Sequence, residues 1–228
     1  YLNRQMAAQN SKLWHLEQIN LFKDLSDEEL EELDHLTVMK TADKNQFIYF
    51  PKEPSKILFF LKAGRIKIGS YSEDGKEVIK AILYPGEVFG EMGIVGEESR
   101  KDFAVAMDSE TRMCTLNVSE FKEMMNANPQ LSLEVTKNIG EKLRNIERRL
   151  ESLIFKDARE RIIDFMKEMA EKYGKKIGVE VLVKHDLTHQ DIANLTATSR
   201  QTVTTVLNDL KEKDLIYMER KRFLIREL

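Results

Sequence analysis

The chain has 228 residues, which suits one large domain or two domains of modest size. Its composition, 42% hydrophobic and 33% charged, is that of a globular protein, and no apolar run approaches the roughly 20 residues that span a membrane. The first ten residues lack the pattern of a secretory signal, and the lone Cys114 permits no intrachain disulfide. We therefore expect a cytoplasmic protein that does not enter the membrane.

The residue types present limit the chemistry of the chain. A single cysteine excludes an iron–sulfur cluster held by one chain, because such a cluster needs about four thiolates. No metal site is expected, since His185 and His189 are separated by a predicted helix cap and the other histidines are scattered. No stretch combines a nucleophile with a nearby histidine, so we expect no enzyme. With a net charge of −3, any contact with DNA must come from locally placed basic residues.

Short strands dominate the first half of the chain after an initial helical stretch. Residues 11–38 are predicted to be helical, with a capping box at Ser26 and Glu29. The β-rich runs that follow are punctuated by turns, and residues 73–76 (EDGK) predict a hairpin. Short strands at this spacing favour an antiparallel jelly roll. The predicted strands are residues 47–50, 57–61, 65–71, 78–83, 103–107 and 112–116.

A long helix is predicted from Pro129 to about residue 156. Its apolar residues are four, four, four, three, four and three positions apart, which is heptad spacing after the first turns. An amphipathic helix lying on its own domain would be the alternative, but the narrow stripe favours a parallel dimer. Two heptads are weak alone, so the neighbouring domain must contribute. The predicted dimer residues are Ile139, Leu143, Ile146, Leu150 and Leu153.

Two short helices are predicted between residues 187 and 215. Thr188 caps the first, with Asp191 as a capping-box partner, and Ser199 caps the second. Small Ala193 allows the helices to cross closely, which favours a helix-turn-helix over an ordinary helical hairpin. The second helix turns one set of residues inward (Val203, Val206, Leu207, Leu210) and another outward (Arg200, Gln201, Thr204, Thr205).

The elements around these two helices complete a winged version of the unit. A helix from Asp157 to about Tyr173 precedes them, followed by a turn bracketed by Gly174 and Gly178 and a strand over residues 179–183. Residues 215–225 alternate into a hairpin whose tip contains Arg220 and Lys221. The basic tip suits a phosphate backbone, although a solvated turn would have the same composition.

A glycine-rich stretch, residues 85–93 (PGEVFGEMG), lies between a predicted strand and one turn of helix. Its glycines let backbone N–H groups approach an anion closely, and a helix N-terminus favours negative charge. The spacing is neither that of a Rossmann fingerprint nor that of a P-loop, and glycines of a β-domain can also mark simple turns. Glu91 would repel a phosphate, but its carboxylate could accept a hydrogen bond from a sugar hydroxyl.

Together these features resemble the superfamily of the cyclic-AMP receptor protein and the fumarate–nitrate reduction regulator (CRP/FNR). The resemblance covers nearly the whole chain and rests on four stretches in the family's order: residues 58–64, 86–93, 155–162 and 188–203. It implies an α+β fold with a cyclic-nucleotide-binding-like β-roll over residues 1–128, a dimerisation helix over 129–156 and a winged helix-turn-helix over 157–228. It also implies a homodimeric transcription regulator that binds near-palindromic double-stranded DNA and contacts RNA polymerase.

The predicted effector site departs from that of the cyclic-AMP-binding branch. The branch's phosphate-gripping Arg-Ser pair is matched by Lys101-Asp102, or by Arg100-Lys101 if the loop is shifted by one residue. A carboxylate about 4 Å from the phosphate would cost roughly 4 kcal/mol. The branch's adenine-contacting Thr-Ser pair is also replaced, so cyclic AMP is disfavoured, a haem remains open and the effector is unidentified. The resemblance places it near Gly90, Glu91, Met92, Arg100, Lys101, Asp102, Lys142, Ile146 and Glu147.

The resemblance also implies which residues contact DNA. Arg200 matches a family position that reads guanine, while Gln201 stands where the family usually has Glu and favours adenine. Ala197 replaces a frequent glycine, a strain of ~1 kcal/mol if the backbone there is left-handed. The predicted DNA contacts are Thr188, His189, Ser199, Arg200, Gln201, Thr204, Thr205, Arg220 and Lys221. The alternative function is a ligand-sensing protein-interaction module with a degenerate DNA-binding domain, which the low basicity of the C-terminal part would fit.

Overall fold

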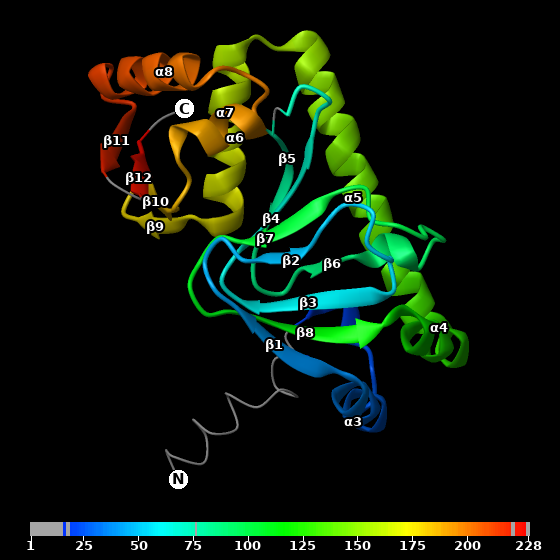
Figure 1. Ribbon diagram of the computed structural model, residues 1–228. Helices are drawn as coiled ribbons and strands as arrows, with labels where there is room; N and C mark the ends of the chain where they lie inside the picture. The colour runs from blue at the N-terminus through cyan, green and yellow to red at the C-terminus, as the bar shows by residue number, and fades with distance from the viewer. Residues whose placement is uncertain (1–15, 17–18, 76, 220–221, 227–228) are drawn as a thin grey trace. The chain divides into compact units, whose positions relative to one another are not determined.

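A computed structural model describes residues 16, 19–75, 77–219 and 222–226. Two compact units divide the chain, residues 1–142 and 143–228. The boundary falls inside one long helix, after Lys142. The mixture of helices and antiparallel strands confirms the α+β fold expected from the sequence (Figure 1).

The first unit is built around two four-stranded antiparallel sheets, in the orders β1-β8-β3-β6 and β2-β7-β4-β5. Aromatic and aliphatic side chains of both sheets, such as Tyr49, Phe59, Phe89 and Met113, form a shared core. This is the β-roll that alternation and turn signals predicted. Its strands are β1 (Val38–Ala42), β2 (Phe47–Tyr49), β3 (Ile57–Ala63), β4 (Ile66–Tyr71), β5 (Glu77–Leu83), β6 (Val88–Phe89), β7 (Phe103–Ala106) and β8 (Thr111–Asn117).

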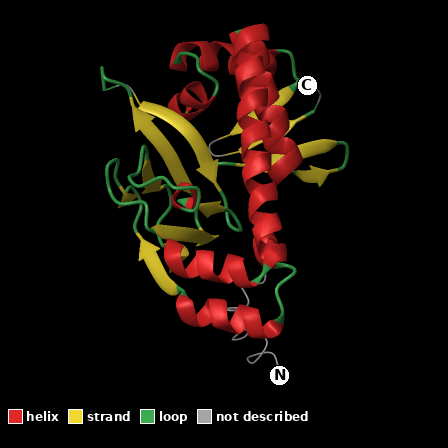
Figure 2. Ribbon diagram, turned by 90° about the vertical axis from the view of Figure 1, so that its right-hand side faces the viewer, coloured by secondary structure: helices red, strands yellow, loops and turns green. Residues whose placement is uncertain are grey.

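Helices cover a second core of the first unit (Figure 2). A 3-10 helix, η1 (Asn20–Phe22), precedes α3 (Asp27–Leu36), and α4 (Val118–Ala127) follows the last strand. The predicted capping box at Ser26 and Glu29 is confirmed. The helix predicted over residues 11–38 is confirmed only in part, because η1 and a turn precede α3 and Val38 begins β1. Part of that range lies outside the described residues. The sequence interpretation also missed α4.

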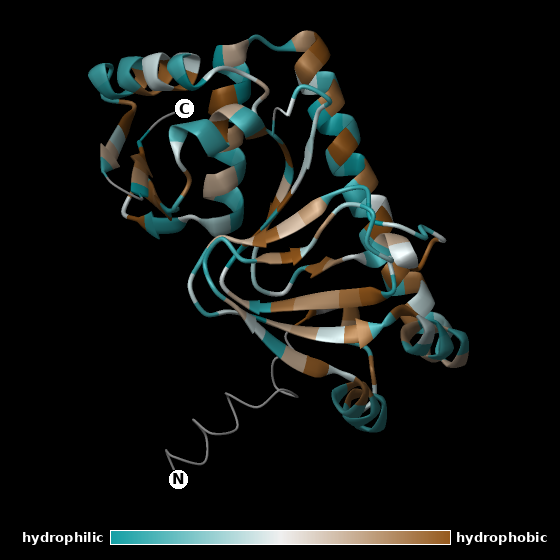
Figure 3. Cartoon of the chain, viewed as in Figure 1, coloured by the Kyte–Doolittle hydropathy of each residue, from teal (hydrophilic) through white to brown (hydrophobic). Residues whose placement is uncertain are grey.

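The long helix α5 (Pro129–Phe155) begins at the predicted proline and continues through the unit boundary. Leu131 and Val135 are buried in the core of the first unit, and Ile139 packs partly against it. Leu143 is the first residue of the stripe that lies in the second unit. Hydrophobic positions recur along the helix in Figure 3.

The second unit contains the predicted winged helix-turn-helix. Its helices are α6 (Ala158–Tyr173), α7 (His189–Leu195) and α8 (Arg200–Glu212). Its sheet has the order β11-β12-β10-β9. The strands are β9 (Lys175–Ile177), β10 (Glu180–Lys184), β11 (Ile216–Glu219) and β12 (Arg222–Ile225). The turn predicted between Gly174 and Gly178 is wrong, because β9 occupies that stretch and only Gly178 has a turn conformation, with φ of +62°.

Candidate DNA-binding and effector sites

The turn between α7 and α8 has the caps that the sequence predicted. The Thr188 hydroxyl accepts from the backbone N–H of Asp191 at 3.1 Å, and the Asp191 carboxylate accepts from the Thr188 N–H at 2.8 Å. Ser199 caps α8 by accepting from the Thr202 N–H at 3.0 Å. These bonds satisfy N–H groups that a helix N-terminus leaves without partners. Both helices therefore begin at the residues that the sequence predicted.

The inward face of α8 is also as predicted, with Val203, Val206, Leu207 and Leu210 all buried. Ala193 of α7 is fully buried where the two helices cross. A large side chain would not fit there without separating the helices. The opposite face of α8 consequently has a fixed orientation, and it exposes a polar surface near the N-terminus of the helix.

Three of the predicted base-reading residues, Arg200, Gln201 and Thr205, are exposed on that surface. Thr204 is half-buried, and its hydroxyl donates to the backbone carbonyl of Arg200 at 2.9 Å. The same hydroxyl lies 2.9 Å from Nδ1 of His189 on α7. Because a hydroxyl has one hydrogen, Nδ1 of His189 donates to it in this arrangement. Thr204 and His189 are therefore engaged with each other across the two helices.

The wing hairpin, β11 and β12, pairs Ile216 with Ile225 and Glu219 with Arg222. Arg222 also forms an ion pair with Glu219, which accepts a hydrogen bond from the Tyr217 hydroxyl at 2.9 Å. The two residues predicted to contact phosphate, Arg220 and Lys221, lie outside the described residues. Among the described part of the wing, Arg222 is thus committed to a neighbouring carboxylate.

Ala197, in the turn before Ser199, has φ of +49°, so the position is left-handed as the sequence interpretation supposed. The turn is held by a bond from the Thr198 N–H to the Ala193 carbonyl at 2.9 Å. Three further carbonyls, those of Leu195, Thr196 and Ala197, accept from arginine side chains of α5 and α6. Sequence reasoning did not identify these arginines, which read as solvated charges on helical faces.

The predicted effector residues of the first unit lie around Arg100, whose side chain is only 4% exposed. Its Nη1 donates to the Gly90 carbonyl at 3.0 Å, and its Nη2 donates to the Ile57 carbonyl. Its guanidinium carbon lies 4.5 Å from the centre of the Tyr49 ring. Lys101, by contrast, is exposed. The side chain that points inward is thus that of Arg100, as in the shifted alignment.

Gly90 cannot be replaced without moving these groups. Its φ is +79°, and a Cβ there would lie 2.8 Å from the Ile57 carbonyl oxygen and 2.9 Å from Nη1 of Arg100. Glycine tolerates this conformation because it has no side chain to clash. Gly90, one of the three glycines of the PGEVFGEMG stretch, therefore permits the close approach of Arg100 to the backbone.

Asp102 and Tyr49 form the second part of this cluster. The Tyr49 hydroxyl donates to Oδ1 of Asp102 at 3.3 Å, and Oδ2 of Asp102 lies 3.1 Å from Nζ of Lys80. Burial raises the pKa of the Tyr49 phenol above its ordinary value, and the nearby Asp102 charge raises it further. Lys80 compensates the carboxylate, so the repulsion of a phosphate by Asp102 is smaller than an unpaired charge would give.

Lys142, near the middle of α5 and the last residue of the first unit, contacts the glycine-rich loop of that unit. Its Nζ lies 2.9 Å from Oε1 of Glu91 and donates to the Val88 carbonyl at 2.8 Å. Glu91 is therefore already partnered where the resemblance implied a sugar contact. Met92 is 47% exposed. Ile146 and Glu147 belong to the second unit.

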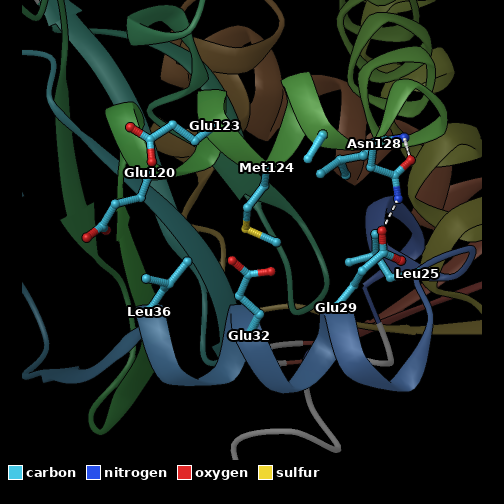
Figure 4. A pocket seen from close by; sticks show the side chains of 10 residues that line it. Leu25, Glu29, Glu32, Leu36, Glu120, Glu123, Met124 and Asn128 are labelled. Carbon is cyan, nitrogen blue, oxygen red and sulfur yellow. Dashed lines mark hydrogen bonds between the residues drawn. The ribbon is translucent and has the colours of Figure 1, made fainter.

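A cavity of about 300 Å³ opens elsewhere in the first unit, between α3 and α4 (Figure 4). Glu29, Glu32, Glu120, Glu123 and Met124 are among the residues that line it. None of the predicted effector residues lines it. The described residues contain no cluster of histidine, cysteine and carboxylate side chains suited to a metal ion. They also contain no helix long and apolar enough to cross a membrane.

Comparison with known proteins identifies both units. The family model of the cyclic nucleotide-binding domain matches residues 39–128, and that of the Crp-like helix-turn-helix domain matches residues 160–228. The chain belongs to the CRP/FNR family of transcription regulators. Like the family, it is a DNA-binding transcription regulator, and its relatives are regulators and not enzymes. The helix-turn-helix match does not favour the alternative of a degenerate DNA-binding domain.

Several relatives align over most of their length. A cAMP-activated global transcriptional regulator of Mycobacterium tuberculosis is 29% identical over 79% of this chain and 80% of its own. The global nitrogen regulator of Nostoc sp. strain PCC 7120 is 25% identical over 83% and 86%. Among solved structures, a CooA mutant from Carboxydothermus hydrogenoformans has a TM-score of 0.76 at 24% identity, covering 96% of this chain and 93% of that one. FixK2 from Bradyrhizobium japonicum has a TM-score of 0.75 at 20% identity, over 84% and 93%.

Proposed function

We propose that this regulator acts as a homodimer on a near-palindromic operator. The observation that carries the proposal is the apolar stripe of α5, whose side chains are exposed in the single chain: Leu143 55%, Ile146 62%, Leu150 57% and Leu153 49%. Their spacing is that of a coiled-coil seam. Burying each leucine or isoleucine would contribute roughly 1.5–3 kcal/mol. A two-fold dimer through this stripe would present two copies of α8 about 34 Å apart, one turn of DNA.

The operator that we propose follows from the exposed residues of α8. Arg200 can donate two hydrogen bonds to O6 and N7 of guanine, Gln201 can bind adenine at N6 and N7, and the methyl group of Thr205 can contact that of thymine. Ser199 and Thr188 lie at helix N-termini, where backbone N–H groups favour phosphate oxygens. The half-site should therefore keep one guanine and differ elsewhere from the TGTGA typical of the family.

We also propose that the β-roll of the first unit takes a small effector other than cyclic AMP. Two internal contacts support this view: Arg100 is bonded to carbonyls of Gly90 and Ile57, and Glu91 is paired with Lys142. A cyclic phosphate and its ribose would have to displace both. A relative named for activation by cAMP is 29% identical to this chain and one named for nitrogen regulation is 25% identical, so family membership does not choose the effector. RNA polymerase is the protein partner that we expect.

Selection of bound sequences from a random DNA pool, with and without cell extract, tests both parts. A regulator of this kind enriches a palindrome with one conserved guanine per half-site, and dependence on extract reveals an effector. Arg200→Ala should weaken binding by about 1–3 kcal/mol and relax discrimination at one base pair. Arg112→Ala, which removes an exposed arginine from β8, is the matched control. Equal weakening of Arg200→Ala on specific and random DNA would contradict base reading.

The dimer and the effector have separate tests. Leu150→Glu should shift the protein to monomer in sedimentation velocity and abolish binding to the full operator, because it places a charge in the seam. Asn145→Glu puts the same charge on another face of α5 and should leave the dimer intact. Saturable micromolar binding of cyclic AMP in calorimetry would disprove the effector proposal.

A further inference from the structure

Two arginines close the C-terminal end of α7, where helix carbonyls have no partners within the helix. Nη2 of Arg149, on α5, donates to the Leu195 carbonyl at 3.1 Å. Nε and Nη2 of Arg161, on α6, donate to the carbonyls of Thr196 at 2.9 Å and Ala197 at 3.1 Å. All of these residues lie in the second unit. The turn that precedes the recognition helix α8 is thus held from outside the helix-turn-helix.

Arg161 also donates a hydrogen bond to the link between α5 and α6 in the same unit. Its Nη1 donates to the carbonyl of Lys156, in the link between α5 and α6, at 2.8 Å. One planar guanidinium therefore joins that link to the turn, and its rigid fork fixes the direction of each bond. Arg149 and Arg161 together form what we call the arginine clamp.

The turn needs such support because of its backbone. Ala197 has φ of +49°, a conformation that costs a residue with a Cβ about 1–2 kcal/mol. Ser199, two residues later, caps α8, and Arg200 follows directly. A change in the turn would therefore rotate the first residues of α8, which are the ones exposed for base reading. The same α5 that bears the apolar stripe also bears Arg149.

We propose that the arginine clamp positions the recognition helix relative to α5, so that the dimer accepts only one spacing between half-sites. The proposal rests on the proposed function, because the spacing matters only if two copies bind one operator. In that dimer, α5 defines the two-fold axis and Arg149 and Arg161 transmit its position to the turn before α8. Neither arginine touches DNA, and both are positioning residues.

The spacing between the two half-sites of an operator is a sensitive measure of how rigidly α8 is held. One added base pair moves a half-site by ~3.4 Å along the axis and by about a tenth of a turn around it. A recognition helix held rigidly cannot follow such a change, whereas a loosened turn can. Loss of the clamp should therefore lower affinity for the selected operator and flatten the preference among operators of different spacing.

The experiment uses the full-length protein and the operator selected by it, with variants of that operator lengthened or shortened by one central base pair. The wild type should prefer the selected spacing by at least about tenfold. Arg149→Met and Arg161→Met should bind the selected operator about tenfold more weakly and distinguish the spacings by less than about threefold. Arg161→Lys, with a single flexible ammonium, should lie between. Arg144→Met, an exposed arginine of the same helix, is the control and should behave as wild type.

Two further measurements distinguish positioning from general destabilisation. Sedimentation should show a dimer for every variant, and hydrogen exchange at the Thr198 and Val203 amides should accelerate in Arg161→Met but not in Arg144→Met. Clamp variants that retain the wild-type spacing preference would overturn the proposal, as would unchanged exchange at these amides. If the wild type selects no operator, the proposed function fails, and the exchange experiment still decides whether the clamp orders the turn.

Discussion

Removing Lys142 should destabilise the first unit, because the residue compensates Glu91 in a largely enclosed site. The Glu91 side chain is 16% exposed and that of Lys142 33% exposed, and their charged atoms are 2.9 Å apart. At an effective dielectric of about 20, two unit charges at this distance attract by about 6 kcal/mol before desolvation is subtracted. Since breaking a buried pair costs about 3–5 kcal/mol and an exposed one below about 1, we expect Lys142→Met to cost about 2 kcal/mol.

Calorimetric unfolding at fixed protein concentration measures this effect. A loss of about 2 kcal/mol should lower the melting temperature of the first unit by roughly 4–8 °C. Glu91→Gln in the Lys142→Met background should recover most of the loss, because it removes the uncompensated carboxylate. Lys137→Met is the control on the same helix: Lys137 pairs with Glu134 but is 54% exposed, so its loss should leave the melting temperature almost unchanged.

The double-mutant cycle decides whether the reasoning holds. Coupling between Glu91 and Lys142 should be at least about 1 kcal/mol. If Lys142→Met costs no more than Lys137→Met, or if Lys142→Met and Glu91→Gln add without coupling, the ion pair does not hold the loop to α5. Lys142 would then not keep Glu91 from binding a sugar hydroxyl.

Three further predictions concern stability. Burial raises the pKa of Tyr84 to about 12, so its neutral form stabilises the fold below pH 10, and that contribution is lost between about pH 10 and 12. Tyr84→Phe should remove the phenolate absorbance that appears near pH 12. An unchanged titration of the absorbance would contradict this. Gly93→Ala should cost about 1–3 kcal/mol in denaturant titrations, because its Cβ would lie 2.1 Å from the Ser55 carbonyl oxygen, whereas Gly140→Ala, which meets nothing within 4 Å, should be neutral or stabilising. Hydrogen bonds from Lys213 and Arg159 lower the pKa of Asp209 below 3.8, so its contribution is present above that pH and is lost in more acidic solution; the difference in melting temperature between wild type and Asp209→Asn should shrink at acidic pH, and a constant difference would refute it.

The helix-turn-helix could be predicted because its signals are local. Caps at Thr188 and Ser199 act on N–H groups three residues away, and the apolar spacing of α8 fixes the face that it buries. Two of the strands that were missed carry little local signal. Strand β1 is exposed at four of its five residues and β9 at all three, so neither shows the alternation of a half-buried strand, and each is ordered by pairing with a neighbour.

The sequence by itself determined the family resemblance and the face of α8 that is exposed for base reading. Helical periodicity and capping leave few alternative structures for a short pair of helices. Only the tertiary structure decided which basic residue enters the β-roll. Arg100 and Lys101 are neighbours in sequence, and the partners that fix Arg100 include the carbonyl of Ile57 and the ring of Tyr49, both distant along the chain. Only the tertiary structure could show the clamp, because Arg149 and Arg161 meet their carbonyls 46 and 35 residues away. The sequence around a charged helical residue does not show which distant group the side chain will bind. Such long-range hydrogen bonds depend on how the helices pack.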